Sequence, residues 1–246
     1  MKKLILVRHG QSEWNKWNLF TGWTDVDLTS KGLSEAFDAG LRLKNEGYKP
    51  QICFTSYLKR AVKTLNQILD AMNMDYLPVE KSWRLNEKHY GVLQAKNKKE
   101  MVEKFGIEKV QQWRRGYNCP PPELEGKSAE EQLKDPRYAE LLPEENPLTE
   151  GLKDCIDRLM PFYYEHILKA FDKYDEVLVV AHGNSLRGIV KTLKNITDEE
   201  ISGLNLPTAI PYIFELDNGL KLQRDFFLAE ASELAKLQQE VANQSK

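Results

Sequence analysis

The segment that decides the fold of this chain is Leu4-Ile5-Leu6-Val7-Arg8-His9-Gly10, a short apolar run that ends in an arginine, a histidine and a glycine. Four consecutive branched apolar residues between charged neighbours predict a strand buried on both faces, as in a parallel sheet covered by helices. In open sheets of this kind, ligands bind beyond the carboxyl ends of the strands. We therefore expect Arg8 and His9 at a ligand-binding edge.

A second segment repeats this design. Residues 177–181 predict another buried strand, which ends in His182 and Gly183. If the two strands are parallel, both histidines emerge at the same edge. Two unrelated structural histidines are the alternative, which leaves unexplained why each follows an apolar strand and precedes glycine. The charge of Arg8 lowers the pKa of a neighbouring imidazole, so we expect His9 to be neutral and nucleophilic.

Length and composition limit the class of protein. With 246 residues the chain can hold one α/β domain with a substantial core, and we predict a single domain over 1–246, with a largely helical insertion at about 92–171 and a C-terminal tail at about 228–246. A net charge of −2 predicts no nucleic-acid partner. No apolar run is long enough to span a membrane. The three cysteines lack metal-ligand spacing, which favours a reduced, cytoplasmic setting and predicts no metal.

Strand and helix patterns alternate along most of the chain and predict a three-layer α/β/α fold with a mostly parallel central sheet. The expected strands are 4–7, 51–55, 77–79, 177–181 and a hairpin over 212–216 and 220–227. The expected helices are 29–45, 57–72, 97–105, 107–115, 149–171 with a kink at Pro161, and 185–194. Residues 117–148 predict a long loop, and 229–242 either an amphipathic helix or a mobile tail.

Several polar residues are candidates for an anion site at the predicted edge. Arg60 falls in the first turn of the helix 57–72, where the helix dipole disfavours a cation unless an anion is bound; a solvated surface arginine is the alternative. Glu87 and Tyr90 lie in an aperiodic polar stretch after a strand. With the two histidines and the amides near Gly183, these groups predict a phosphoryl-transfer site in which the protein supplies positioning and charge.

The segment 14–27 combines aromatic residues with small polar ones. Its tryptophans are expected to pin the loop to the core, whereas Asn15, Thr21 and Gly22 offer small donors and bare backbone to a ligand. His89 has charged neighbours and no apolar frame, and we interpret it as structural. This loop therefore predicts further ligand contacts beside His9.

These motifs resemble a known family. The two His-Gly motifs at 9–10 and 182–183 are similar to those of the histidine phosphatase superfamily. Further blocks resemble its 2,3-bisphosphoglycerate-dependent phosphoglycerate mutases: RHGQSEWN at 8–15, FTGW at 20–23, LKRA at 58–61, LNEKHYG at 85–91, QWRRG at 112–116, HGNSLR at 182–187 and LPT at 206–208. The likeness extends from the first strand to the hairpin.

The resemblance implies an activity and a role for each matching residue. The activity is the glycolytic and gluconeogenic interconversion of 3-phosphoglycerate and 2-phosphoglycerate through a phosphohistidine. His9 would carry the phosphoryl group, His182 would stabilise the transition state, and Glu87 would exchange a proton with the substrate hydroxyl. The phosphoryl group would be held by Arg8, Asn15, Arg60 and the Gly183 amide, with Thr21 and Gly22 also at the site. The carboxylate and the other phosphate would be bound by Tyr90, Lys98, Arg114, Arg115 and Asn184.

The resemblance also implies 2,3-bisphosphoglycerate as the primer of His9, no metal, and a homodimer or larger assembly. Two departures stand out: Gln11 replaces a glutamate common in the family, and Ala95-Lys96 replaces Gly-Leu. Neither removes a group named above, but the charge of Lys96 is expected to shift anion affinity or the mobility of a lid. Two alternatives stay open: a phosphatase in which water attacks phospho-His9, and a non-catalytic module that binds phosphoproteins.

Overall fold

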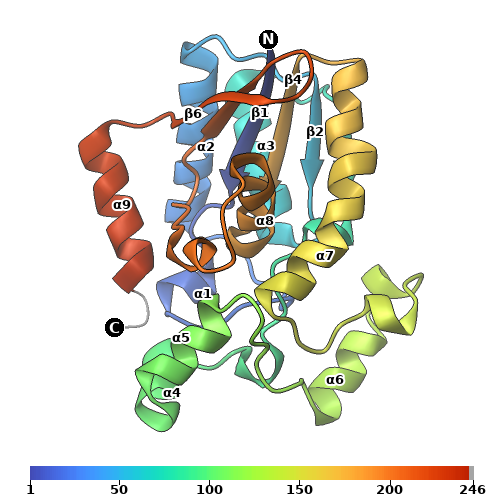
Figure 1. The fold of residues 1–246 in the computed structure, drawn as a ribbon, viewed down its shortest axis with the longest axis vertical. Coiled ribbons are helices and arrows are strands. Elements are labelled where there is room, and N and C mark those ends of the chain that lie inside the picture. The colour runs from blue at the N-terminus through green and yellow to red at the C-terminus, as the bar shows by residue number, and fades with distance from the viewer. Residues whose placement is uncertain (244–246) are drawn as a thin grey trace.

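The computed structural model describes residues 1–243, and one six-stranded sheet lies at its centre (Figure 1). The strands are β1 (Lys2–Arg8), β2 (Ile52–Thr55), β3 (Val79–Lys81), β4 (Glu176–Ala181), β5 (Tyr212–Leu216) and β6 (Leu222–Phe227), in the order β3-β2-β4-β1-β5-β6. Strands β1 to β4 run parallel, and only β5 pairs antiparallel with its neighbours β1 and β6. The predicted mostly parallel sheet is confirmed.

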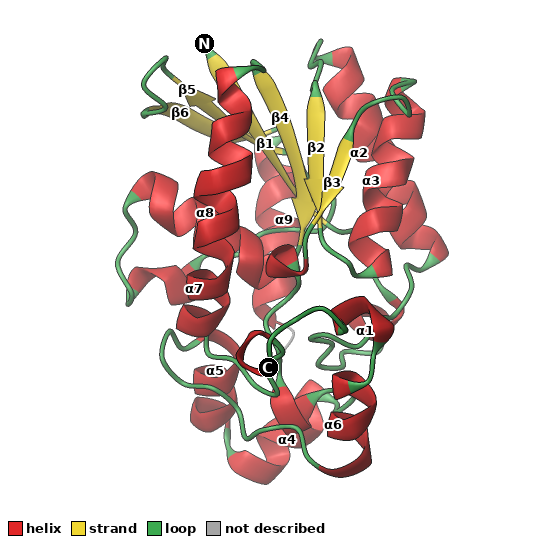
Figure 2. Ribbon diagram, turned by 90° about the vertical axis from the view of Figure 1, so that its right-hand side faces the viewer, coloured by secondary structure: helices red, strands yellow, loops and turns green. Residues whose placement is uncertain are grey.

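Helices cover both faces of this sheet, as Figure 2 shows. On one face lie α2 (Ser30–Asn45) and α3 (Lys59–Met72), and on the other α7 (Leu152–Phe162) and α8 (Gly183–Lys194). Because side chains alternate along a strand, Ile5 and Val7 of β1 pack toward α2 and α3, whereas Leu4 and Leu6 pack toward α7 and α8. The predicted three layers are confirmed.

The connections create a crevice at the carboxyl ends of β1 and β4. These two strands are neighbours, yet β1 leads to α2 on one face and β4 leads to α8 on the other. Such a switch point is where open α/β sheets bind ligands. Beyond this end lie α1 (Glu13–Lys16), α4 (Lys98–Phe105), α5 (Ile107–Arg115) and α6 (Gly126–Leu133) (Figure 1).

Helix α9 (Ala231–Asn243) lies beside α2 at the edge of the molecule (Figure 1). The guanidinium of Arg42 in α2 forms an ion pair with Glu233 in α9 at 2.6 Å. Of the two predictions for this segment, the helix is confirmed; residues 244–246 of the predicted tail lie outside the described part of the chain. Within the described residues, no helix combines the length and apolar character needed to cross a membrane.

Two predictions for the segment 117–171, one of a loop and one of a helix, were wrong in detail. The predicted loop 117–148 contains α6 and short 3-10 turns at Pro136–Tyr138 and Pro143–Glu145, because its proline-rich start obscured a run of helix formers. The predicted helix 149–171 begins at Leu152 and changes to a π-helix over Tyr163–Leu168. Pro161 has no N–H to donate, so the regular hydrogen-bond pattern is broken just before this change.

Other boundaries shift by two residues. Helix α3 begins at Lys59 and not at 57, and Ser56, just before the predicted start, contacts a histidine described below. Helix α8 begins at Gly183 and not at 185, so the amides of Gly183 and Asn184 belong to its first turn. Strand β3 spans Val79–Lys81 and not 77–79, because its pairing with β2 begins at Val79.

Candidate active site

Two histidines lie side by side where β1 and β4 end. The register pairs Arg8 of β1 with Ala181 of β4, so His9 and His182 are the next residues of the two strands. The N–H of His9 continues the ladder by donating to the carbonyl of Ala181 at 3.0 Å. The centroids of the two imidazole rings are 5.0 Å apart. The two rings are therefore direct neighbours at the ends of the strands.

A main-chain carbonyl orients the ring of His9. Its Nδ1 lies 2.8 Å from the carbonyl oxygen of Gly10, and because a carbonyl only accepts, Nδ1 carries the ring proton. Burial lowers the pKa of His9 well below its ordinary value, and the charges of Arg60 and Arg8 lower it further. The neutral ring therefore presents an unprotonated Nε2, the form that attacks phosphorus.

The ring of His182 is fully buried and is held by a serine that the sequence did not single out. Nε2 of His182 is 2.8 Å from the hydroxyl of Ser56. That hydroxyl accepts from the N–H of Leu58 at 3.1 Å, which favours its own proton being donated to Nε2 and the proton of His182 being on Nδ1. Burial, and then the charge of Arg60, lowers the pKa of His182 well below its ordinary value. A neutral His182 with Nδ1–H can donate to an anion without repelling His9.

Two arginines flank the histidines: Arg60 is buried and Arg8 is half-buried. Arg60 is 1 % exposed, and its guanidinium donates to the carbonyls of Gly22 at 2.7 Å and Thr24 at 2.9 Å. Arg8 donates to the carbonyl of Leu206 at 2.8 Å. Burial lowers the pKa of Arg60 to about 10, and both side chains line the pocket. The alternative of a solvated Arg60 is wrong.

The single carboxylate in the pocket lining is that of Glu87, within the described residues. Its Oε1 accepts from the amides of Lys88 at 2.8 Å and Asn184 at 3.1 Å. The Asn184 amide, expected from sequence to receive an external anion, is therefore occupied by this carboxylate. A Cβ at Gly183 would lie 3.6 Å from Nε of Arg8 and 3.7 Å from Oε2 of Glu87, so this backbone faces both charged groups at van der Waals distance.

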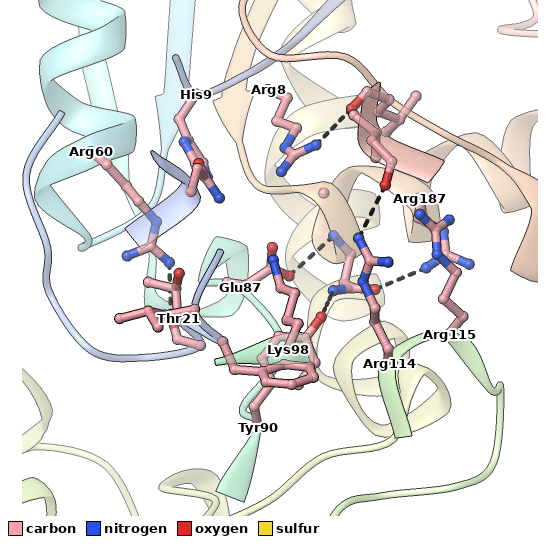
Figure 3. A pocket seen from close by; sticks show the side chains of 18 of the residues that line it. Arg8, His9, Thr21, Arg60, Glu87, Tyr90, Lys98, Arg114, Arg115 and Arg187 are labelled. Carbon is pink, nitrogen blue, oxygen red and sulfur yellow. Dashed lines mark hydrogen bonds between the residues drawn. The ribbon is translucent and has the colours of Figure 1, made fainter. Parts of the chain in front are cut away.

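The loop 14–27 contributes five lining residues, and three of them, Asn15, Thr21 and Gly22, were predicted from the sequence. The short helix α1, which the sequence did not predict, is capped by Ser12 and Asn15: each side chain accepts from the other's amide, at 3.2 Å and 3.1 Å. This capping fixes the side chain of Asn15 at the pocket. Thr21, Gly22 and Arg60 all line the pocket. Figure 3 shows Thr21 beside Arg60.

The insertion provides the opposite side of the pocket, where Figure 3 shows Arg114, Arg115 and Arg187 together. Arg114 donates to the carbonyl of Val241 in α9 at 3.1 Å, and Arg115 donates to carbonyls of residues 202 and 204 at 3.3 Å each. The side-chain amide of Asn184 donates to the hydroxyl of Tyr90 at 3.0 Å and so connects α8 to the segment just before the insertion. Residues from several distant segments thus meet here.

Arg187 belongs to the pocket although the sequence prediction omitted it. Its guanidinium donates to Oδ1 of Asn184 at 3.0 Å and also to the carbonyl of Ile201. Its position three residues after Asn184 on α8 puts both on one helix face, and this spacing was the available signal. Arg187 therefore orients the amide that contacts Tyr90.

Positive charge dominates this pocket. Burial and the charge of Arg115 lower the pKa of Arg114 to about 9. Burial lowers the pKa of Lys98 well below its ordinary value, and the charges of Arg114 and Arg8 lower it further. These shifts mean that the cations destabilise one another when no anion is present. An anionic ligand would relieve this repulsion, which makes the pocket suited to a compound with several negative charges.

The pocket has a volume of about 650 Å³ including its open mouth. The predicted residues that line it are Arg8, His9, Asn15, Thr21, Gly22, Arg60, Glu87, Tyr90, Lys98, Arg114, Arg115, Gly183 and Asn184. His182 is not among them and has no exposed surface. His89 also lies outside: its Nε2 is 2.6 Å from Oε1 of Gln132 in α6. Within residues 1–243, no group of three or more His, Cys, Asp or Glu side chains could hold a metal ion.

Comparison with known proteins identifies the family. A model of the histidine phosphatase superfamily, branch 1, matches residues 4–135. A 2,3-bisphosphoglycerate-dependent phosphoglycerate mutase of Porphyromonas gingivalis is 55 % identical over 246 residues, covering 100 % of this chain and 99 % of the relative. The 2,3-bisphosphoglycerate-dependent phosphoglycerate mutase 2 of Bacteroides thetaiotaomicron is 56 % identical, with the same coverage of both chains. The chain belongs to the histidine phosphatase superfamily, and within it to the 2,3-bisphosphoglycerate-dependent phosphoglycerate mutases.

Solved structures of more distant histidine phosphatases share the fold. A mycobacterial glucosyl-3-phosphoglycerate phosphatase, solved with VO3, gives a TM-score of 0.70 at 19 % identity and covers 94 % of this chain and 100 % of its own. Mycobacterial hydrolase 1 gives a TM-score of 0.70 at 19 % identity, covering 94 % and 99 %. At this identity the likeness concerns the α/β/α architecture alone.

Proposed function

We propose that this chain interconverts 3-phosphoglycerate and 2-phosphoglycerate through a phosphoryl group carried on Nε2 of His9, with 2,3-bisphosphoglycerate as the primer. The observation that carries the proposal is the state of His9: Gly10 fixes its proton on Nδ1, burial keeps the ring neutral, and Nε2 is left as a nucleophile. The full-length relatives named as mutases of this type support the same reaction.

The side chains of the pocket divide the chemistry between them. When His9 is phosphorylated, the 2-hydroxyl of 3-phosphoglycerate attacks phosphorus, a new P–O bond forms and the P–N bond to His9 breaks. Glu87 accepts the hydroxyl proton. After the bound bisphosphate reorients, His9 attacks the 3-phosphoryl group and Glu87 returns the proton to the departing oxygen, which releases 2-phosphoglycerate. Arg8, Arg60 and His182 stabilise the charge that develops on the transferring group.

The charge of the pocket fits the bisphosphate. Arg8 and Arg60 lie on the side of His9, whereas Lys98, Arg114 and Arg115 line the pocket from the insertion. Each charge-assisted hydrogen bond to a phosphate contributes about 1.5–3 kcal/mol. Positive groups on both sides can hold one phosphate beside His9 while the carboxylate and the second phosphate are bound by the insertion.

Exclusion of water favours transfer to a second substrate over hydrolysis. His9 is 3 % exposed, and the carbonyl of Val241 in α9 reaches Arg114 at 3.1 Å, so that the insertion and α9 approach each other at the pocket. These contacts support a mutase, in which the phosphohistidine must outlast the exchange of substrates. A phosphatase would need an open path for water.

A turnover assay tests the proposal. The protein is incubated with 3-phosphoglycerate with and without a trace of 2,3-bisphosphoglycerate, and both 2-phosphoglycerate and free phosphate are measured. We expect 2-phosphoglycerate to form, with a rate that rises with the primer and little free phosphate. Free phosphate without 2-phosphoglycerate would instead identify a phosphatase, and neither product, together with saturable binding, would identify a non-catalytic binding module.

The setting of this activity is also a proposal. A cytoplasmic location is supported by the three free cysteines, of which Cys53 and Cys155 are buried; burial raises the pKa of each thiol to about 12 and so suppresses its reactivity. Glycolysis and gluconeogenesis would be the pathways served. A homodimer or larger assembly stays a prediction from the family resemblance.

A further inference from the structure

The main chain that carries Glu87 is held by a buried ion pair outside the pocket. Arg158 of α7 and Glu150, just before α7, form this pair at 2.5 Å, with side chains 8 % and 2 % exposed. Neither residue is part of the pocket lining. Both nevertheless bind the irregular segment 83–90 that ends at the pocket, which has no repeating hydrogen-bond pattern of its own beyond the 3-10 turn Trp83–Leu85.

Arg158 binds this segment through its carbonyl oxygens. Its Nη1 donates to the carbonyl of Arg84 at 2.7 Å, and its Nη2 donates to those of Asn86 at 3.1 Å and Glu87 at 2.9 Å. Arg84 donates back to the carbonyl of Arg158 at 3.0 Å. The planar guanidinium thus holds three of the four carbonyls from Arg84 to Glu87, and the indole N–H of Trp23 also donates to the last of them at 2.8 Å.

Glu150 fixes the other end of the segment. Its Oε2 accepts from the amide of His89 at 2.7 Å, and its own amide donates to the carbonyl of His89 at 3.0 Å. Its carboxylate also accepts from Nε and Nη2 of Arg158 at 2.5 Å and 3.0 Å. The residue between these two sets of bonds is Lys88, so the backbone of Glu87 is held on both sides.

A purely structural role does not explain this choice of residues. A buried ion pair contributes little net stability compared with apolar packing of the same volume, because desolvation of both charges opposes their attraction. What the pair supplies is a set of directional bonds to a segment that has few of its own. The direction of the Glu87 carboxylate relative to a substrate hydroxyl depends on that backbone.

We propose that Arg158, oriented by Glu150, is a positioning residue that holds the Glu87 carboxylate where it can exchange a proton with the substrate. The inference rests on the proposed function, in which Glu87 performs that exchange. It assigns to α7 a part in the reaction through the peptide groups of residues 84–87, without contact with the substrate.

Two phosphoryl donors with different leaving groups distinguish a positioning role of Arg158 from a general effect on the stability of the protein. When His9 attacks 2,3-bisphosphoglycerate, the N–P bond forms, the P–O bond breaks, and the departing alkoxide needs the proton of Glu87. When His9 attacks p-nitrophenyl phosphate, the departing phenolate is stable without a proton. A misplaced Glu87 should therefore slow the first reaction and spare the second.

The experiment measures the first phosphorylation of His9 by rapid mixing, with each donor in turn, in four proteins: the unaltered chain, Arg158→Lys, Glu87→Gln and Ile167→Ala. Lysine keeps the positive charge beside Glu150 but loses the planar fork. Ile167 is fully buried in the core and distant in sequence from Glu87, so its truncation controls for lost stability. Thermal unfolding of each protein is measured in parallel.

We expect Arg158→Lys to slow phosphorylation by 2,3-bisphosphoglycerate about 10²-fold, with p-nitrophenyl phosphate nearly unaffected, as for Glu87→Gln. Equal slowing with both donors, as expected of Ile167→Ala, would overturn the inference. If Glu87→Gln changes the phosphorylation rate by the same factor with both donors, the proposed role of Glu87 fails instead. If Arg158→Lys does not fold, Glu150→Gln replaces it, with the same donor preference expected and the same equal slowing as the contradicting result.

Discussion

Two sides of the pocket are built in different ways. The strand-end side consists of Arg8, His9, Arg60 and His182, and the insertion side consists of Lys98, Arg114 and Arg115. On the strand-end side, the main-chain register of β1 and β4 places the histidines directly. On the insertion side, the arginines are attached through side-chain bonds to carbonyls in α9 and near residue 204.

This difference suggests a division of labour. Groups placed by a sheet have little freedom to move, as the proposed phosphoryl transfer at His9 requires. Groups on short helices have more freedom to adjust to the proposed reorientation of a bound bisphosphate. We therefore expect changes on the strand-end side to act mainly on kcat and those on the insertion side mainly on KM.

The largest effect is expected from His9→Asn. Removal of the proposed nucleophile should lower kcat by on the order of 10⁴–10⁶-fold, because the proposed carrier of the phosphoryl group is lost. Steady-state turnover of 3-phosphoglycerate measures it. The matched control is His166→Gln, because His166 pairs with Glu80 at the surface, far from the pocket. Substantial residual turnover of His9→Asn would mean that the nucleophile is elsewhere.

Paired arginine variants test the division between the two sides. Arg60→Lys should lower kcat by about 10–150-fold, the equivalent of one charge-assisted hydrogen bond of about 1.5–3 kcal/mol at the transferring group. Arg115→Lys should raise KM by a similar or smaller factor and leave kcat nearly unchanged. Rates measured over a range of 3-phosphoglycerate concentrations give kcat and KM separately for both variants. If both variants change only kcat, or both change only KM, the division is contradicted.

The buried histidines predict a pH dependence of stability. Because the pKa values of folded His9 and His182 lie well below the ordinary 6.5, the unfolded chain binds protons that the folded chain does not as pH falls below 6.5. The free energy of unfolding should therefore decrease toward acid by about 1.4 kcal/mol per pH unit for each histidine. Denaturant unfolding between pH 5 and pH 7 measures this slope, which should be shallower in His9→Asn. An unchanged slope in that variant would show that His9 is not responsible.

The smallest effect is expected at Ala95, one of the departures from the family. Its φ of 67° is left-handed, which costs a residue with a Cβ about 1–2 kcal/mol. Ala95→Gly should raise the free energy of unfolding by about 0.5–1 kcal/mol, after allowing for the greater entropy of unfolded glycine, and leave kcat unchanged. The control is Ala139→Gly, because Ala139 has an ordinary φ of −62° and its replacement should destabilise the chain. If both variants change the free energy of unfolding in the same direction, the proposed strain at Ala95 is contradicted.

The strand-end side was predictable because its signals are local. An apolar run that ends in a histidine and glycine specifies both the strand and the position of the side chain, and β1 and β4 carry this signal independently. Arg60 was only partly predictable: its place in a first turn favoured an anion site, but its burial depends on carbonyls of the loop at 22–24.

The remaining features depend on contacts between distant segments. The insertion side was assigned by family resemblance alone, since adjacent arginines at a helix end are ordinarily dipole partners. Ser56 was not singled out because nothing in the sequence near it indicates that His182 will lie 2.8 Å away. Arg158 was overlooked for the same reason, since its carbonyl partners are more than 70 residues distant.

The most direct test of the central claim is to locate the phosphoryl group after the protein is exposed to 2,3-bisphosphoglycerate. Mass spectrometry of the intact chain and of its peptides is carried out at alkaline pH, with acid treatment as the comparison. We predict one acid-labile phosphoryl group on His9, absent from His9→Asn. A phosphoryl group on another residue, or one that survives acid, would contradict the assignment of His9 as the nucleophile.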